Sequence, residues 1–514
     1  MFRRRDALVA LGRASDLGMG MPDDRSLRCA LLAHGVAVAA GHSPREVRDA
    51  VYVSLLRFAG CTADARTAAR VMGDEVATRG EMYGRASFAE PREMLAFVWR
   101  HAGQGRGFAG QVATFARALA RMPELYQTAV AHCEVNDLVV ERLGVAPSTR
   151  AALADAFECW NGMGVPRRLR GDAIALPARV AVLADDLEAA HHYGGVDGAL
   201  DRARFASGRA LDPALCDTFR RHAATLCAPL DASSPAEALS RLALDDDPTL
   251  DDATVEALAA VLGDFADLKC RYTVGHSSAV AELVTRAAAL ASVPASERAT
   301  LRRAAFVHDL GRVAVTASIW EHPGPLSDAQ RERVRMHALH TERLLARTPV
   351  LAPLSDLAGA AHERLAGGGY HRGLPPLALG RAARLLAAAD VYQALRSERP
   401  HRPARDAERA RSAMRDEVRE GRLDADAAEA VLAAAGETPA ARPRAVAGLT
   451  ERELEVLSLL ARGMSNRAIA DALGVAPKTA GNHVQAVFRK AGVTTRSGAA
   501  MFAMRHGLAP GERS

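Results

Sequence analysis

The stretch that decides the fold is AAFVHDLGR, residues 304–312, where a His-Asp doublet ends an apolar helix-forming run. The imidazole of His308 and the carboxylate of Asp309 can both bind a metal ion, and a carboxylate can bridge two ions. Further candidate ligands lie on both sides of the doublet. The full set is His276, His308, Asp309, His337, His362 and Asp390. A lone histidine on an apolar helix is usually a core residue, but four histidines and two aspartates in one region indicate a two-metal site.

Two-metal sites hold their ions roughly 3.5–4 Å apart and clamp an in-line displacement at phosphorus. The pattern therefore predicts a metal-dependent phosphohydrolase. His340 lies one helical turn from His337 and is expected at the surface or behind the ligands. Glu363 is expected to support the ligands rather than to catalyse.

Outward from the doublet, helical periodicity dominates, and no run of alternating β-branched residues is present, so we expect an all-α protein. A chain of 514 residues predicts several domains. Two polar stretches, 230–252 and 434–448, have the composition of linkers. The expected domains are residues 1–235, 253–433 and 448–510, with a Pro/Ala linker over 434–447.

The first two domains are related by an internal duplication. FECWNGMGVPRRL (157–169) aligns with HERLAGGGYHRGL (362–374) at an offset of 205, which also pairs His132 with His337 and Asp185 with Asp390. Nearer each start, LLRFAGC (55–61) aligns with FVHDLGR (306–312) at an offset of 251, which implies about 46 extra residues inside the first copy. We therefore expect two tandem copies of one helical domain.

The first copy has lost most of the candidate ligands. Arg25 replaces His276, Arg57 replaces His308, Phe58 replaces Asp309 and Phe157 replaces His362, while His132 and Asp185 persist. Arginine and phenylalanine do not ligate metals. The first copy is therefore expected to be metal-free and inactive, and to serve as a scaffold, a partner for the second copy or a sensor pocket. The His191-His192 pair is expected to be an ordinary surface pair.

The C-terminal residues predict a helical DNA-binding domain. Thr450 and Glu453 form a capping box, and Leu454, Leu457 and Leu460 follow at helical spacing. A second helix is expected after Ser465, ending at Gly474, and a third helix starts near Pro477. Ala480, Val484, Val487 and Ala491 form the predicted buried stripe of the third helix.

The opposite side of the third helix is polar and has no acidic residue, so it can enter a major groove. The candidate DNA-binding residues are Lys478, Thr479, Gly481, Asn482, Gln485 and Arg489. This tail resembles the LuxR-type helix-turn-helix domain. It departs from that pattern at Ala476, where the family usually has a capping serine, and at Ala480, where it usually has valine. A small helical protein-interaction module is the alternative interpretation.

The middle domain, from about residue 258 to 433, resembles the HD-GYP branch of the HD superfamily of metal-dependent phosphohydrolases. The resemblance implies that the six residues named above are metal ligands, that Asp309 bridges two divalent transition metal ions (Mn or Fe), and that Arg312 stands for the family's lysine near the phosphate. It also implies a cyclic dinucleotide substrate, typically cyclic di-GMP. Ala361, Ala366 and His371 depart from the family's HHExxDGxGYP motif.

The charge distribution and the sequence signals limit which partners and which compartment are expected. From Ala441 to the end there are 11 Lys/Arg against 5 Asp/Glu, whereas the remaining 440 residues hold 55 against 56. This basic end favours a polyanion partner for the tail alone. The seven cysteines are dispersed, and no signal peptide or membrane-spanning run is recognisable, so a reducing cytoplasm and no membrane contact are expected.

The leading hypothesis is a transcriptional regulator, expected to be a homodimer by analogy with LuxR-type proteins, whose HD module hydrolyses a cyclic dinucleotide. A catalytically inactive nucleotide sensor and a phosphohydrolase of another nucleotide are the alternatives.

Overall fold

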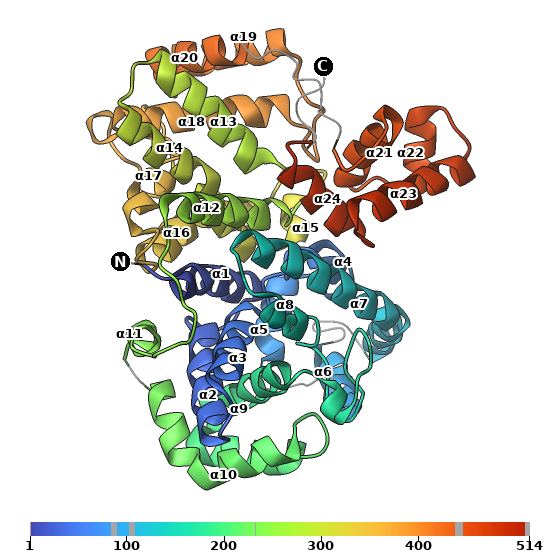
Figure 1. The fold of residues 1–514 in the computed structure, drawn as a ribbon. Helices are drawn as coiled ribbons and strands as arrows, with labels where there is room; N and C mark the ends of the chain where they lie inside the picture. The colour runs from blue at the N-terminus through green and yellow to red at the C-terminus, as the bar shows by residue number, and fades with distance from the viewer. Residues whose placement is uncertain (1, 84–89, 102–107, 232, 437–445, 509–514) are drawn as a thin grey trace. The chain divides into compact units, whose positions relative to one another are not determined.

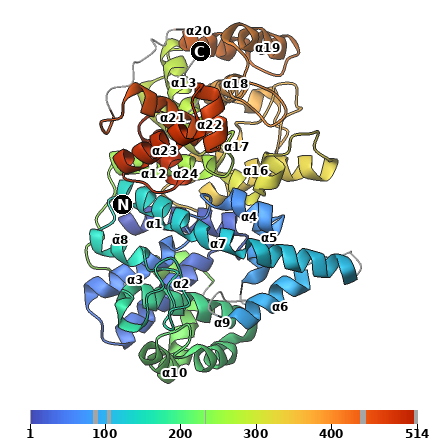
Figure 2. The same cartoon turned by 90° about the vertical axis from the view of Figure 1, so that its right-hand side faces the viewer.

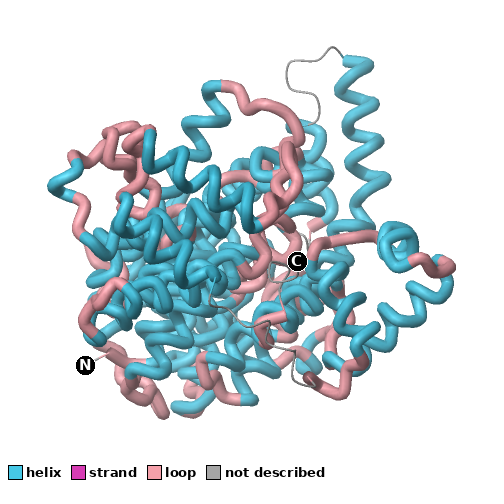
Figure 3. The backbone as a smooth tube through the Cα atoms, turned by 90° about the horizontal axis from the view of Figure 1, so that it is seen from above, coloured by secondary structure: helices cyan, strands magenta, loops and turns pink. Residues whose placement is uncertain are grey.

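The computed structural model describes residues 2–83, 90–101, 108–231, 233–436 and 446–508. Within these ranges the chain folds into helices, turns and loops without a β-strand (Figure 3), which confirms the all-α prediction. The chain divides into two compact units, Met1–Asp251 and Asp252–Ser514 (Figure 1). None of the helices described is long and apolar enough to cross a lipid bilayer.

The first unit is built around α2, α3 and α9, which pack against one another with the core between them. Its N-terminal basic segment is helical. Its helices are α1 (Arg4–Met19), α2 (Arg25–Ala39), α3 (Pro44–Leu56), α4 (Ala65–Met72), α5 (Glu75–Met82), α6 (Pro91–His101), α7 (Phe108–Arg142), α8 (Pro147–Leu153), η1 (Gly171–Ala173), α9 (Leu176–Ala206), α10 (Pro213–Cys227), η2 (Ala228–Asp231) and α11 (Pro235–Ser240).

The second unit begins with a bundle in which α13 packs on α14, α18 and α20. The bundle helices are α12 (Asp252–Asp267), α13 (His276–Leu290), α14 (Ala295–Val307), η3 (Leu310–Ala314), α15 (Ala317–Trp320), α16 (Asp328–Ala346), η4 (Ala352–Leu354), α17 (Ser355–Gly359), η5 (Pro376–Ala378), α18 (Arg381–Arg396), α19 (Ala407–Arg419) and α20 (Ala425–Gly436). The C-terminal helices are α21 (Glu451–Ala461), α22 (Asn466–Leu473), α23 (Pro477–Ala491) and α24 (Arg496–Arg505).

Equivalent helices of the two units begin at the offsets found in the sequence. The helices α2 and α3 correspond to α13 and α14 at an offset of 251, and α9 corresponds to α18 at 205. A close backbone approach recurs as well. A Cβ on Gly60 would lie 2.1 Å from the His132 carbonyl oxygen, and a Cβ on Gly311 would lie 2.1 Å from that of His337. Both positions therefore require glycine, and the two units share one fold.

The extra residues of the first copy form helices of their own. Between Cys61 and His132 lie α4, α5, α6 and the first part of α7, whereas the second copy has only the short α15 and the start of α16 in the equivalent interval. Figure 2 shows α6 running beside α7. The insertion therefore adds a helical extension and leaves the shared helices in place.

The two predicted linkers differ in the structure. The stretch 230–252 is held to the first unit, because Asp247 accepts a hydrogen bond from the Tyr52 hydroxyl at 2.9 Å and pairs with Arg5 at 2.9 Å. The first unit consequently extends to Asp251 rather than to the expected boundary at 235. Most of the second predicted linker, residues 437–445, lies outside the described residues.

Candidate metal centre and DNA-binding surface

The six predicted ligands come from five separate places in the second copy and meet at one point. His276 is the first residue of α13, His308 follows the last residue of α14, and Asp309 precedes η3. His337 lies on α16 and Asp390 on α18, while His362 lies in the loop after α17. All six are buried, with at most 5% of each residue exposed. Residues 114 positions apart in the sequence therefore share one site.

The ligand atoms form two groups that share Asp309. One group is His276, His308, Asp309 and Asp390, and the other is Asp309, His337 and His362; within each group the ligand atoms lie within 4.8 Å of one another. Asp309 Oδ2 lies 3.2 Å from His308 Nε2, whereas Asp309 Oδ1 lies 3.1 Å from His337 Nε2. Asp309 thus offers one oxygen to each group, as a bridging carboxylate does.

Buried polar atoms at the centre fit a pair of cations. His308 Nε2 is buried and makes no hydrogen bond within the described structure, which is costly unless another group binds it. The Nε2 atoms of His337 and His362 face each other at 2.9 Å. His308 Nδ1 lies 2.7 Å from the Ala305 carbonyl, so Nδ1–H donates there and Nε2 is directed into the site. The donor set of imidazole and carboxylate suits divalent transition metals.

Electrostatics keep both carboxylates ionised. Burial disfavours the charge on Asp309, but Arg312 and His308 outweigh it and hold the pKa of Asp309 well below its usual range. Burial also opposes the charge on Asp390, but a hydrogen bond from His276 and the charge of His308 hold the pKa of Asp390 well below the usual range. Burial lowers the pKa of His276 to about 4, whereas Asp309 and Asp390 raise the pKa of His308 to about 10 against the effect of burial. Ionised carboxylates are the forms that bind a metal, and a bound cation would take the place of the proton on His308.

Arg312 lies beside the bridging carboxylate. Its Nη2 is 2.8 Å from Asp309 Oδ2, and its guanidinium lies 5.0 Å from the centroid of the Trp320 ring. Its Nε and Nη1 atoms are buried and make no hydrogen bond. Arg312 is thus fixed on two sides and keeps two donors for an anionic ligand.

The departures from the family motif have separate structural consequences. Ala361 is fully buried next to His362 and offers no ligand atom. Ala366 is exposed on the loop. The side chain of His371, in the place of the motif's proline, pairs with Glu342 at 2.9 Å. Glu363 accepts hydrogen bonds from the backbone N–H groups of Arg372, Gly373 and Leu374, so it holds the loop together, which agrees with the supporting function expected of it.

Sequence reasoning missed three residues at this site. Tyr370 stacks on the His362 ring, with ring centroids 5.2 Å apart and planes within 6°. Trp320 meets the His337 ring edge-on with centroids 5.7 Å apart. Burial and the charge of Arg312 lower the pKa of Arg399. Tyr370 was visible in the aligned GGGYH motif, but Trp320 and Arg399 lie in segments without a repeat or ligand pattern.

Two predictions about other histidines have mixed outcomes. His340 is half-buried, and its Cβ lies 2.8 Å from the position of a Cβ on Gly311, so it packs behind the ligands. His192 is exposed, but His191 is buried with 9% exposure and has its Nε2 3.6 Å from Asp231, so the expected surface pair is wrong for His191. It lies on the side of α9 that packs inward.

The equivalent positions of the first copy hold cations and aromatic rings instead of ligands. Arg25 forms an ion pair with Asp185, and Arg57 Nη1 lies 3.4 Å from the same carboxylate. Phe58 and Phe157 contact each other with centroids 5.8 Å apart, and the His132 ring lies 4.9 Å from Phe157. Two guanidinium groups thus lie beside Asp185, which is the counterpart of Asp390 in the second copy.

The C-terminal helices have the predicted caps and turns. The Thr450 side chain accepts a hydrogen bond from the N–H of Glu453, and the Ser465 side chain accepts one from Ala468. Gly474 adopts a left-handed conformation with φ 63°, which ends α22. Ala476 makes no side-chain cap for α23, as its residue type requires.

The polar side of α23 is open to solvent. Ala480, Val484 and Val487 are buried, while Ala491 is half-buried. The six candidate DNA-binding residues lie on the other side; Gly481 is half-buried and the rest are exposed, namely Lys478, Thr479, Asn482, Gln485 and Arg489. Lys490 pairs instead with Glu453 at 2.6 Å and ties α23 to the start of α21.

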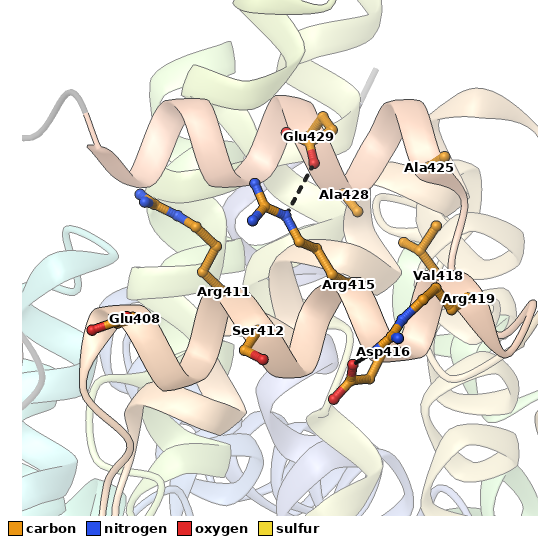
Figure 4. Close-up of a pocket in the computed structure, with 10 residues that line it drawn as sticks. All are labelled: Glu408, Arg411, Ser412, Arg415, Asp416, Val418, Arg419, Ala425, Ala428 and Glu429. Carbon is orange, nitrogen blue, oxygen red and sulfur yellow. Dashed lines mark hydrogen bonds and ion pairs between the residues drawn. The ribbon is translucent and has the colours of Figure 1, made fainter.

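A separate groove lies between α19 and α20 (Figure 4). Arg411 and Arg415 extend from α19 toward α20, where Arg415 Nε lies 3.8 Å from Glu429. The lining mixes arginines with acidic side chains, and none of the six candidate ligands belongs to it. This groove has the character of a solvated helix face.

Comparisons with known proteins agree with the geometry. Residues 260–427 match the HD domain family, and residues 447–503 match the bacterial regulatory proteins of the luxR family. The chain is 27% identical to the 3'3'-cGAMP-specific phosphodiesterase 3 of Vibrio cholerae over 81% of this chain and 91% of that protein.

A shorter match and a solved structure extend this result. The chain is 35% identical to a cyclic di-GMP phosphodiesterase of Pseudomonas aeruginosa over 26% of this chain and 32% of that protein. The crystal structure of a cyclic GMP-AMP-specific phosphodiesterase of V. cholerae superimposes with a TM-score of 0.58 at 24% identity, covering 85% of this chain and 99% of that one. The helical architecture of the two copies is therefore shared with a solved protein.

Proposed function

We propose that this chain, in which an HD phosphodiesterase module precedes a LuxR-type DNA-binding domain, hydrolyses a cyclic dinucleotide in its second copy and couples that site to DNA binding. The observation that carries the proposal is the pair of ligand groups sharing Asp309, with one carboxylate oxygen toward each group. Such a constellation suits hydrolysis of a phosphodiester. The names of the V. cholerae and P. aeruginosa relatives support a cyclic dinucleotide as the substrate class.

Different residues of the chain would hold the cations and bind the phosphate. His276, His308, Asp309, His337, His362 and Asp390 would hold two divalent cations, of which Mn and Fe suit the donors. When bound, such cations lower the pKa of water and stabilise negative charge on phosphoryl oxygens. Arg312 would donate its free Nε–H and Nη1–H to the phosphate, since its Nη2 is already held by Asp309. Trp320 and Tyr370 offer aromatic surface beside the ligands.

The test combines metal analysis with a substrate panel. The purified chain is loaded with Mn or Fe, its metal content is measured, and it is incubated with 3'3'-cGAMP, cyclic di-GMP and a mononucleotide. We expect close to two equivalents of metal and a linear dinucleotide product from at least one cyclic substrate. Fewer than about one equivalent after reconstitution would rule out a two-metal mechanism. Turnover of the mononucleotide alone would favour the phosphohydrolase of another nucleotide.

A second candidate function is that of a sensor that binds the nucleotide without turnover. Two observations favour it: Arg312 already pairs with Asp309 Oδ2, and Ala361 contributes no ligand atom where the family has a histidine. Saturable binding of a cyclic dinucleotide without any product, by metal-loaded protein, would support the sensor over the enzyme.

For the C-terminal domain, we propose that α23 enters the major groove of DNA with Lys478, Thr479, Gly481, Asn482, Gln485 and Arg489, and that the chain acts as a homodimer in the cytoplasm. Asn482 can form paired hydrogen bonds with an adenine edge, whereas Arg489 suits a phosphate. Asn482→Ala should therefore relax base preference by about 1–3 kcal/mol at one position, and Arg489→Ala should weaken binding to all sequences and reduce the salt slope by about 1. Quantitative gel-shift titrations at several salt concentrations check both, and sedimentation measures the dimer.

A further inference from the structure

We propose that the first copy carries a binding site for a phosphorylated nucleotide, in which Arg25 and Arg57 bind the phosphate and Phe58 and Phe157 offer the faces for the base. The site lies where the second copy gathers its metal ligands, but its chemistry is different. The inference goes beyond hydrolysis in the second copy and does not depend on it.

The two arginines of the cluster differ in how fully they are paired. Arg25 and Arg57 share the carboxylate of Asp185. Arg25 Nε also lies 4.0 Å from Glu188, whose two oxygens are held by Arg28 Nε at 2.7 Å and by the Tyr83 hydroxyl. Arg25 also interacts with the charge of Asp16, whereas Arg57 is held at the longer distance of 3.4 Å from Asp185. Arg57 is therefore the arginine to which an anion would add most.

Donors of both arginines remain unused. Arg57 Nε is buried and makes no hydrogen bond within the described structure, and Arg25 Nε makes none either and lies 4.0 Å from the carboxylate of Glu188. The Arg25 side chain is 3% exposed and the Arg57 side chain 12%. Buried charged donors without an acceptor are costly, and two adjacent guanidinium groups fit the oxygens of a phosphate. Burial and the charge of Arg25 lower the pKa of Arg57 to about 10.

Aromatic rings flank the arginines. The Arg25 guanidinium lies 5.0 Å from the centroid of Phe58, and that of Arg57 lies 5.2 Å from the centroid of Phe157. Both rings are half-buried, and the Asp185 side chain between the arginines is 21% exposed, so the cluster reaches solvent. Aromatic faces beside arginines stack nucleobases, which inorganic phosphate cannot exploit. The combination therefore points to a nucleotide rather than to a small anion.

The test is calorimetric titration of the metal-loaded full chain with GMP and with inorganic phosphate. The decisive variant is Arg57→Met, which keeps the side-chain length but removes the charge. Arg241→Met is the matched control, because Arg241 is exposed in the same unit and forms an exposed ion pair with Glu237, four positions before it. We expect wild-type and Arg241→Met protein to bind GMP more tightly than phosphate, and Arg57→Met to lose at least about tenfold in GMP affinity.

A second variant separates the two halves of the site. Phe157→Leu should weaken GMP binding while leaving phosphate binding unchanged, and circular dichroism confirms that each variant is folded. Absence of GMP binding by wild-type protein at millimolar concentration overturns the proposal, as does an Arg57→Met variant that binds GMP as wild type does. Equal affinity for phosphate and GMP overturns the assignment to a nucleotide.

Discussion

The two copies share a scaffold and differ at its centre. In both, a buried aspartate near the end of one helix accepts hydrogen bonds from a serine in the first turn of the next helix: Asp16 of α1 from Ser26 of α2, and Asp267 of α12 from Ser277 of α13. In the second copy, Asp309 and Asp390 are surrounded by histidines, and Arg312 pairs with Asp309. In the first copy, Asp185 is met by Arg25 and Arg57. The fold thus tolerates exchange of its ligands for cationic side chains.

The largest expected effect comes from the bridging carboxylate. Asp309→Asn should reduce cyclic dinucleotide hydrolysis by roughly a thousandfold or more, because the amide removes the charge that both ligand groups share. Metal content should fall below one equivalent per chain, measured by mass spectrometry. Asp328→Asn is the control, since Asp328 is an exposed acid at the start of α16. Retention of two equivalents by Asp309→Asn would contradict the bridging assignment.

Removal of the metal by a chelator should destabilise the second copy and leave the first copy unchanged. A metal that binds only the folded state at a thousand times its Kd stabilises it by about 4 kcal/mol. Removal of the metal should therefore accelerate hydrogen exchange in α13, α16 and α18, whose residues hold the ligands, and leave α2, α3 and α9 unchanged. Exchange followed by mass spectrometry distinguishes the two sets of peptides. Equal acceleration in both copies would mean that the first copy also depends on metal.

Much of this comparison was predictable from the sequence, because ligand types, caps and repeat offsets are local patterns. The HDLGR and HERLAGGGYHRGL segments predicted the six residues that the structure brings together, and the offsets of 205 and 251 predicted the equivalent helices. The Thr450–Glu453 capping box and the turn at Gly474 are equally local.

Long-range contacts were not predictable in the same way. The packing of Asp247 against Tyr52 and Arg5 joins residues about two hundred positions apart, and its acidic, Pro-containing segment has the composition of a linker. The position of Trp320 on His337 also depends on tertiary structure. No periodicity or motif in these segments carries that information.

The two arginines of the first copy should differ in their contribution to stability. Arg25→Met removes the main partner of Asp185 and should lower the free energy of unfolding by about 2 kcal/mol, less than for a fully buried pair because Asp185 is 21% exposed. Arg57→Met leaves that pair intact and relieves repulsion, so its effect should be below about 0.5 kcal/mol. Chemical denaturation measures both. A larger loss for Arg57→Met would show that Arg57, not Arg25, neutralises Asp185.

The smallest effect concerns Asp16, an element that the copies share. Burial raises the pKa of Asp16 to about 7, opposed by the charge of Arg25 and the hydrogen bonds from Ser26 and assisted by Glu188. A raised pKa in the folded state means that the stabilisation is complete below the unfolded value near 4 and is lost as the pH rises through 7. Wild-type protein should therefore lose roughly 1 kcal/mol relative to Asp16→Asn between pH 6 and pH 8. Denaturant titrations of both proteins across this range give the difference. A difference that is independent of pH would show that Asp16 is already ionised at pH 6, and that the arginine-rich centre of the first copy reaches this carboxylate more strongly than burial does.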